Sequence, residues 1–237
     1  MGYQNVFRRY EIKYLIDREQ ERRLRMLIPA YMHPDAYGRS VIRNIYYDTP
    51  DHRLIRRSLE GPVYKEKLRI RSYQTATADS TVFVELKKKY DSVVYKRRAP
   101  MTEAQAREFM ECHRAQPETQ ILREIGYVLD FYEDLRPTVY LSCEREAFYG
   151  NRDAEFRLTL DDRIMGRTTA LSLCAEPGGE RLLAEDTVLL EVKTAGALPL
   201  WLVDWLTAER IYKNSFSKYG AAYRQLINTT KGEREYV

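Results

Sequence analysis

Alternating apolar and polar residues run through much of the chain, and they predict a protein built mainly of β-strands. Successive residues of a strand point to opposite faces, so a strand with one buried face shows a period of two. Segments with this period are also rich in β-branched and aromatic residues, as strands are. They predict eight strands, at residues 6–14, 40–48, 63–74, 80–90, 93–98, 138–150, 153–162 and 185–194.

Helical patterns separate these strands. Asp17 and Gln20 form a D-x-x-Q start signal for a helix that ends near Met32, and Thr102 and Gln105 form a similar signal. Further helices are predicted at residues 122–132, 199–212 and 217–227. Amphipathic helices pack on apolar surfaces, so we expect them to cover the apolar faces of the strands.

The polar faces of six strands carry charges. In KLRIR, for example, Lys67, Arg69 and Arg71 share one face, opposite Leu68 and Ile70. The other cations assigned to such faces are Arg9, Lys13, Arg43, Lys87, Arg157 and Lys193, and the carboxylates are Glu11, Glu85, Asp161 and Glu191. For any single strand, a solvated outer face explains this pattern. In a closed sheet with helices outside, the same faces would line the bore.

An ionic bore with an excess of cations predicts an anionic ligand. Moving an unpaired cation out of water costs several kcal/mol, so a group of them implies bound anions or water. Arg binds phosphate or carboxylate oxygens with several donors at once. The sequence therefore favours a linear polyanion as the guest.

Composition and charge narrow the class of protein. The 237 residues carry a net charge of only +4, but residues 65–98 hold ten Lys/Arg against four Asp/Glu. We expect one domain over residues 1–237, because no linker or repeat interrupts the chain. No membrane segment is expected, since the most apolar stretch, residues 198–206, contains Asp204. The three cysteines are far apart, which predicts neither disulfides nor a metal knuckle and favours a cytoplasmic location.

An ordered series of short motifs resembles the VTC domain, the polyphosphate polymerase branch of the CYTH/triphosphate tunnel superfamily. The motifs are YEIKY (10–14), RNIYYDTPD (43–51), KLRIR (67–71), VELKKK (84–89), YKRR (95–98), CERE-AF (143–148), FRLTLD (156–161), LEVK (190–193) and FSKYG (216–220). The resemblance implies an α+β fold, an eight-stranded antiparallel β-barrel tunnel with flanking helices.

The resemblance also implies a set of site residues. Catalytic roles are expected for Lys218, Glu191, Arg69 and Arg71, and phosphate binding for Lys13, Arg43, Lys67, Lys87, Lys96, Arg145, Arg157, Lys193 and Ser217. Glu191 matches a ligand of a divalent cation, for which we expect Mn²⁺ first and Mg²⁺ second. Glu11 and Glu85 are further candidate ligands, although each would serve equally well by holding cations of the bore in place. Lys88, Lys89, Arg97 and Arg98 are expected to form a solvated rim or an entrance that attracts phosphate, and not to be catalytic.

The function implied is a polyphosphate polymerase that transfers the terminal phosphate of ATP to a growing polyphosphate chain. Hydrolytic relatives carry ExExK in the first strand, whereas positions 9, 11 and 13 here are Arg, Glu and Lys. This difference favours binding of polyphosphate over hydrolysis. A triphosphatase with the same fold and a non-catalytic polyphosphate-binding module remain as alternatives. ATP and polyphosphate are the expected partners. Nucleic acid is not expected, because KLRIR and YKRR lack interleaved aromatic residues.

Overall fold

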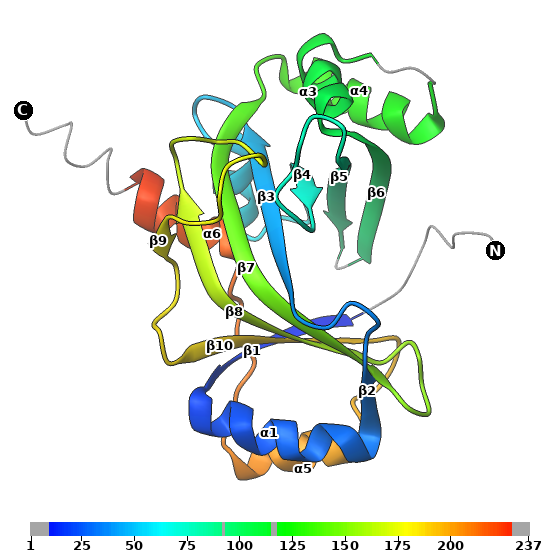
Figure 1. Cartoon of the computed structure of the whole chain (residues 1–237), viewed down its shortest axis with the longest axis vertical. Coiled ribbons are helices and arrows are strands. Elements are labelled where there is room, and N and C mark those ends of the chain that lie inside the picture. The colour runs from blue at the N-terminus through cyan, green and yellow to red at the C-terminus, as the bar shows by residue number, and fades with distance from the viewer. Residues whose placement is uncertain (1–9, 92, 115–117, 229–237) are drawn as a thin grey trace, which may run out of the picture.

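A ten-stranded antiparallel sheet forms the centre of the computed structural model, which describes residues 10–91, 93–114 and 118–228 (Figure 1). Eight strands follow one hydrogen-bonded path in the order β1-β10-β8-β7-β3-β4-β5-β6. They are β1 (Tyr10–Asp17), β3 (Ser40–Asp48), β4 (Tyr64–Ser72), β5 (Thr81–Tyr90), β6 (Val93–Thr102), β7 (Arg136–Gly150), β8 (Arg157–Arg167) and β10 (Thr187–Thr194). The short strands β2 (Met32–Pro34) and β9 (Glu180–Arg181) pair with β7 and β8. The eight predicted strands are thus confirmed, although residues 6–9 of the first lie outside the described residues.

The sheet does not close on itself within the described residues. Its hydrogen-bonded path ends at β1 on one side and at β6 on the other. The closed barrel that we expected from the sequence is therefore not confirmed. Side chains do cross the gap, since Lys87 Nζ on β5 lies 3.1 Å from Glu11 Oε2 on β1.

Helices begin where the sequence signals place them. They are α1 (Arg18–Tyr31), α2 (Arg53–Leu59), α3 (Glu103–Cys112), α4 (Gln120–Tyr132), α5 (Leu200–Ala208) and α6 (Lys218–Ala222), and a π-helical turn, η1 (Tyr223–Ile227), follows α6. Both expected capping boxes are present, Asp17 with Gln20 and Thr102 with Gln105. The exception is α2, for which no local signal was found and whose N-cap residue, His52, makes no side-chain cap bond.

Helices cover the outer face of the sheet at two separate places. At one end, α3 and α4 pack on β5 and β6, and Phe109 and Leu129 share a buried cluster with Val84 and Leu86. At the other end, α1 and α5 lie together beside β1 and β10 (Figure 1). No helix of the described ranges is long and apolar enough to cross a membrane.

The C-terminal segment packs on the opposite face. Tyr219, Tyr223 and Ile227 form a third buried cluster with Ile42 of β3 and Leu141 of β7. These two residues also line the cavity described below. The end of the described chain therefore covers part of the face that carries the cavity and brings the start of α6 to its edge.

Candidate functional site

A cavity of about 890 Å³ lies against the inner face of the curved sheet. Strands from both ends of the hydrogen-bonded path contribute side chains to it, and so does the start of α6. Eleven of its lining residues are Lys or Arg, namely Lys13, Lys67, Arg69, Arg71, Lys87, Lys96, Arg98, Arg145, Arg157, Lys193 and Lys218. Only two lining residues are carboxylates, Glu11 and Glu191. The cavity therefore has a strong excess of positive charge.

One buried carboxylate organises four of these cations. Glu85 is only 1% exposed, and its oxygens lie 2.7 Å from Arg69, 2.6 Å from Lys96, 3.3 Å from Arg98 and 3.8 Å from Arg71. Burial opposes ionisation of Glu85, but the surrounding cations outweigh it and hold its pKa well below the usual range. Glu85 thus fixes the positions of the cations, and its oxygens are already engaged, so they do not fit a metal ion.

A second cluster joins β8, β10 and α6. Asp161 is fully buried; it accepts a hydrogen bond of 2.5 Å from Arg145 Nε and contacts Lys218 Nζ. Glu191 lies 3.4 Å from both Lys218 and Arg145. Burial opposes the charge on each carboxylate, but Arg145 and Lys218 keep the pKa of both below its ordinary value. The same two carboxylates raise the pKa of Lys218 against the effect of burial, so Lys218 is a permanent cation.

Three other lysines hold their protons weakly. Burial, together with Lys13 and Lys87, lowers the pKa of Lys67 to about 7. Burial also lowers the pKa of Lys96 and of Lys193 to about 8, although Glu85 and Glu191 partly oppose it. An anion in the cavity would favour the charged form of all three, because it adds opposite charge at short range.

The start of α6 is fixed by residues of β3. Ser217 is the N-cap of the helix, and its Oγ also accepts a hydrogen bond of 3.0 Å from Lys67 Nζ. Tyr219 donates to Asp48, and its ring stacks on Tyr46 with 4.6 Å between the centroids. Lys218 lies between these two anchored residues, so its amino group is held at the cavity wall.

Twelve of the thirteen residues assigned to the site from the sequence line this cavity. Arg43 is the exception. Its Nη2 donates to Thr75 Oγ1 at 2.9 Å, and it alternates with the cavity residues Ile42 and Asn44 along β3. Arg43 therefore belongs to the opposite face, with Ile45, and does not line the cavity with the other residues assigned to phosphate binding. The strict alternation of β3 already carried this information.

The sequence analysis also missed residues of the cavity. Arg98 was expected in a solvated rim or a phosphate-attracting entrance and was not assigned to the site. It lines the cavity with Lys96, whereas Arg97 between them turns outward to Glu124 at 2.6 Å. Asp161 appeared only as one of the charges on the inner faces, but it holds Arg145 and Lys218. Period-two alternation places Lys96 and Arg98 on one face, so this signal could have identified Arg98.

The donor set can be tested against a divalent cation. Lys13 Nζ lies between the two lining carboxylates, 3.6 Å from Glu191 and 3.7 Å from Glu11. No group of three or more His, Cys, Asp or Glu side chains suited to a metal occurs in the part of the chain that the structure describes. Mg²⁺ commonly binds one or two carboxylates and completes its shell with substrate phosphates and water. The closest cations lie 2.6 and 2.7 Å from Glu85, whereas the contacts of Glu191 and Glu11 with cations are 3.1 Å or longer. Glu191 and Glu11 are therefore the carboxylates that fit such a cation, which would bind together with the phosphates. Arg9 lies outside the described residues.

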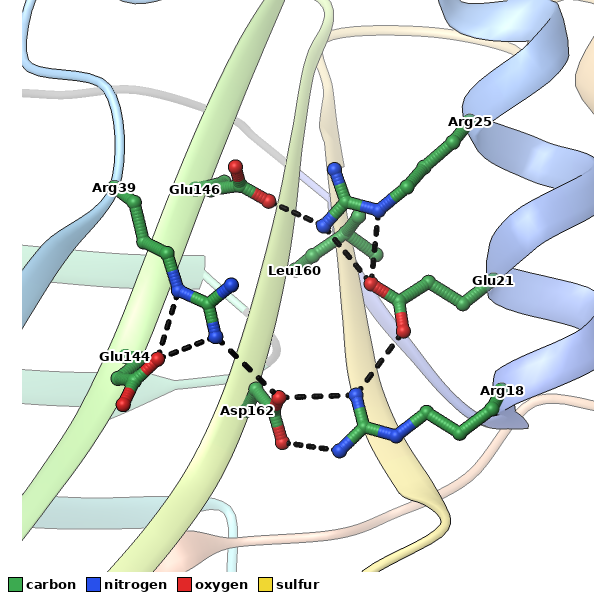
Figure 2. A pocket seen from close by; sticks show the side chains of 8 residues that line it. All are labelled: Arg18, Glu21, Arg25, Arg39, Glu144, Glu146, Leu160 and Asp162. Carbon is green, nitrogen blue, oxygen red and sulfur yellow. Dashed lines mark hydrogen bonds and ion pairs between the residues drawn. The ribbon is translucent and has the colours of Figure 1, made fainter.

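A second, smaller cavity of about 340 Å³ lies on the outer face, between α1 and strands β7 and β8 (Figure 2). Its lining alternates guanidinium and carboxylate groups, from Arg18, Glu21, Arg25, Arg39, Glu144, Glu146 and Asp162. Figure 2 shows that every one of these charges points at an opposite charge within the group. This outer ion-pair cluster ties α1 to the sheet and has no excess of cations for an anion.

Solved structures of other proteins share this fold. A Bacillus halodurans protein described as a candidate adenylate cyclase shares 16% identity, with a TM-score of 0.58 over 94% of this chain and 100% of its own. The Hippeastrum protein HpAC1, a candidate adenylyl cyclase described as revealing a dominant triphosphatase activity, shares 17% identity, with a TM-score of 0.56 over 90% of this chain and 94% of its own. These likenesses show a common fold. No curated protein gave a significant match. The model of the VTC domain matches residues 8–227, nearly the whole sequence, and the chain therefore belongs to the VTC domain family.

Proposed function

We propose that the cavity binds a chain of phosphates and that the protein is a polyphosphate polymerase, which transfers the terminal phosphate of ATP to a growing polyphosphate. The observation that carries this proposal is the convergence of eleven Lys and Arg side chains on one cavity with only two lining carboxylates. Such an excess of cations in a partly dry site needs an anion of high charge. A phosphate chain is such an anion, because each of its phosphate units carries negative charge.

The residue types suit phosphoryl transfer. This reaction needs positioning and stabilisation of charge more than it needs a nucleophile from the protein. Arg69 and Arg71, fixed by Glu85, would orient the phosphate chain. Lys218 and Arg145, fixed by Asp161, would lie beside the transferring group and stabilise its charge. A divalent cation, Mn²⁺ or Mg²⁺, held by Glu191 and Glu11 would neutralise further charge on the phosphate oxygens.

Two features favour a polymerase over a hydrolase. Glu85 and Asp161 do not line the cavity, which leaves Glu191 and Glu11 as its carboxylates in the described residues. Position 9 is Arg, where hydrolytic relatives carry the first Glu of ExExK. With few carboxylate ligands, the site is poorly suited to bind two metal ions that activate water. The additional cations favour binding of a long polyanion.

A triphosphatase is the second candidate. The fold shared with HpAC1, a protein described as having a dominant triphosphatase activity, supports it. In this reading the same cations bind a single triphosphate, and water replaces the polyphosphate end as the acceptor.

One assay separates these functions. The purified protein is incubated with ATP and Mn²⁺, and the products are resolved on a gel that separates phosphate polymers from free phosphate. A ladder of polymers supports the polymerase. Free phosphate alone supports the triphosphatase, and absence of both products together with tight binding of polyphosphate would leave a binding module without turnover.

A further inference from the structure

Part of the cavity wall is apolar, although the rest is strongly charged. Phe83 of β5 and Pro100 of β6 are direct partners in the sheet, and both line the cavity with Ile121 of α4. Tyr73 lies next to Phe83, with 5.8 Å between the ring centroids, and is 42% exposed. An inorganic phosphate chain has no apolar surface to place against these side chains. The wall therefore suits a ligand that carries an aromatic group as well as phosphates.

Arg98 lies over the ring of Phe83 in this wall. The carbon of its guanidinium lies 3.5 Å from the centroid of the Phe83 ring, and its Nη2 donates to Tyr73 Oη at 3.0 Å. The side chain is still 33% exposed and lines the cavity. A guanidinium fixed on an aromatic ring offers a planar surface on which a second ring can stack.

The apolar wall adjoins the cations proposed to hold phosphates. Glu85 contacts Arg98 through one oxygen and Arg69 through the other, and it contacts Lys96 as well. A nucleoside triphosphate has the same arrangement of chemistry, with an aromatic base at one end of a short phosphate chain. The wall and the cations are thus placed to bind the two ends of one molecule.

We propose that the nucleobase of a nucleoside triphosphate binds at Tyr73, Phe83 and Arg98, with the base stacked on the guanidinium of Arg98. The inference rests on the proposed function and adds to it the place at which the base of the ATP donor binds. Because of this stacking, the cavity holds ATP more tightly than inorganic tripolyphosphate.

The test compares binding of ATP and of inorganic tripolyphosphate by calorimetry, without divalent cations so that no turnover occurs. Arg98→Lys keeps the charge and removes the planar group, and Phe83→Leu keeps an apolar side chain but removes the ring beneath Arg98. Each should weaken ATP binding about ten-fold, as loss of a stacking partner does. Phe83→Leu should leave tripolyphosphate binding unchanged, whereas Arg98→Lys, which alters one of the cavity cations, should weaken it less than it weakens ATP binding. Arg97→Lys is the matched control, because Arg97 lies on the opposite face of β6 and pairs with Glu124; it should change neither affinity.

Fluorescence gives a second readout. A triphosphate of 2-aminopurine riboside should be quenched on binding to the wild type, because its base stacks, and less so on binding to Arg98→Lys. Equal losses of ATP and tripolyphosphate binding in the variants, or none, would overturn the inference while leaving phosphate binding in place. If the wild type binds neither ligand, the proposed function fails, and the nucleobase site fails with it.

Discussion

The hydroxyl of Tyr219 donates a 2.7 Å hydrogen bond to Asp48 Oδ2, and both side chains are buried. Asp48 also accepts from the backbone N–H groups of Leu54 and Ile55, at 2.8 and 3.0 Å, in the first turn of α2. One carboxylate therefore joins the end of β3, the start of α2 and the start of α6. Because Lys218 directly precedes Tyr219, this link determines where the amino group of Lys218 lies in the cavity.

Tyr219→Phe tests this link. The change removes the hydroxyl and leaves the ring stacked on Tyr46, so we expect a loss of about 1–2 kcal/mol in the free energy of unfolding, as for one buried hydrogen bond. If Asp48 positions Lys218 through Tyr219, turnover should also fall while the affinity for tripolyphosphate stays near that of the wild type. Chemical denaturation and product assays measure the two effects. A stability loss with wild-type turnover would limit the link to a structural role.

Local signals in the sequence predicted most of the elements. The cap signals at Asp17 and Thr102 gave the starts of two helices, because a capping box is a contact within four residues. The helix α2 was missed because residues before the helix satisfy its first N–H groups. Thr49 accepts from Arg53, and Asp48, at the end of β3, accepts from Leu54 and Ile55. Closure of the sheet was expected from family resemblance, and β1 and β6 do not pair within the described residues.

The inner face was predicted well where alternation was applied strictly, as for Lys67, Arg69 and Arg71. The prediction of this face failed at Arg43, which was placed with the cations although it shares a face with Ile45 and Tyr47. Ion pairs between residues far apart in the sequence could not be predicted. No local pattern indicates that Asp161 of β8 contacts Lys218 of α6. Such contacts depend on the packing of α6 against the sheet.

Lys218→Ala is expected to abolish turnover and leave a folded protein. Loss of one group that stabilises charge in a transition state costs roughly 100- to 1,000-fold in rate. Asp161 keeps Arg145 as a partner in this variant, so the buried carboxylate is not left alone. Product assays and thermal unfolding test the prediction. Unchanged polymer or phosphate release would remove the role proposed for Lys218, and restored activity in Lys218→Arg would show that the charge suffices.

Binding of tripolyphosphate should take up protons at pH 8. In the unliganded protein, burial lowers the pKa of Lys67 to about 7, so Lys67 is mostly neutral at this pH, and Lys96 and Lys193, with pKa values of about 8, are half protonated. A bound anion raises these pKa values, so protons are taken up and the affinity falls as pH rises above about 7.

Calorimetry in two buffers with different ionisation enthalpies measures this uptake directly. Lys67→Met should reduce the number of protons taken up and flatten the dependence of affinity on pH. The control is Lys88→Met, outside the cavity lining, which should alter neither quantity. An affinity that does not change between pH 7 and 9 would contradict the assigned roles of the three lysines.

Asp161 and Asp162 are neighbours on β8 that serve opposite faces of the sheet, and they offer a matched pair of variants. Asp162 accepts two hydrogen bonds from Arg18, at 2.9 and 2.7 Å, within the outer ion-pair cluster. Asp162→Asn should therefore lower the free energy of unfolding by about 1–3 kcal/mol, as expected for hydrogen bonds to a charged group, and leave tripolyphosphate affinity unchanged.

Asp161→Asn should instead change binding, because it removes the charge that holds Arg145 and Lys218 at the cavity wall. The dependence of stability on pH tests the role of Asp162. Burial opposes the charge on Asp162, but Arg18 outweighs it and lowers its pKa in the folded state. The stability that Asp162 contributes is thus present above the unfolded pKa and is lost as pH falls through the folded value. The difference in stability between the wild type and Asp162→Asn should shrink below about pH 4, and a constant difference down to pH 2 would show that the outer cluster does not act through this charge.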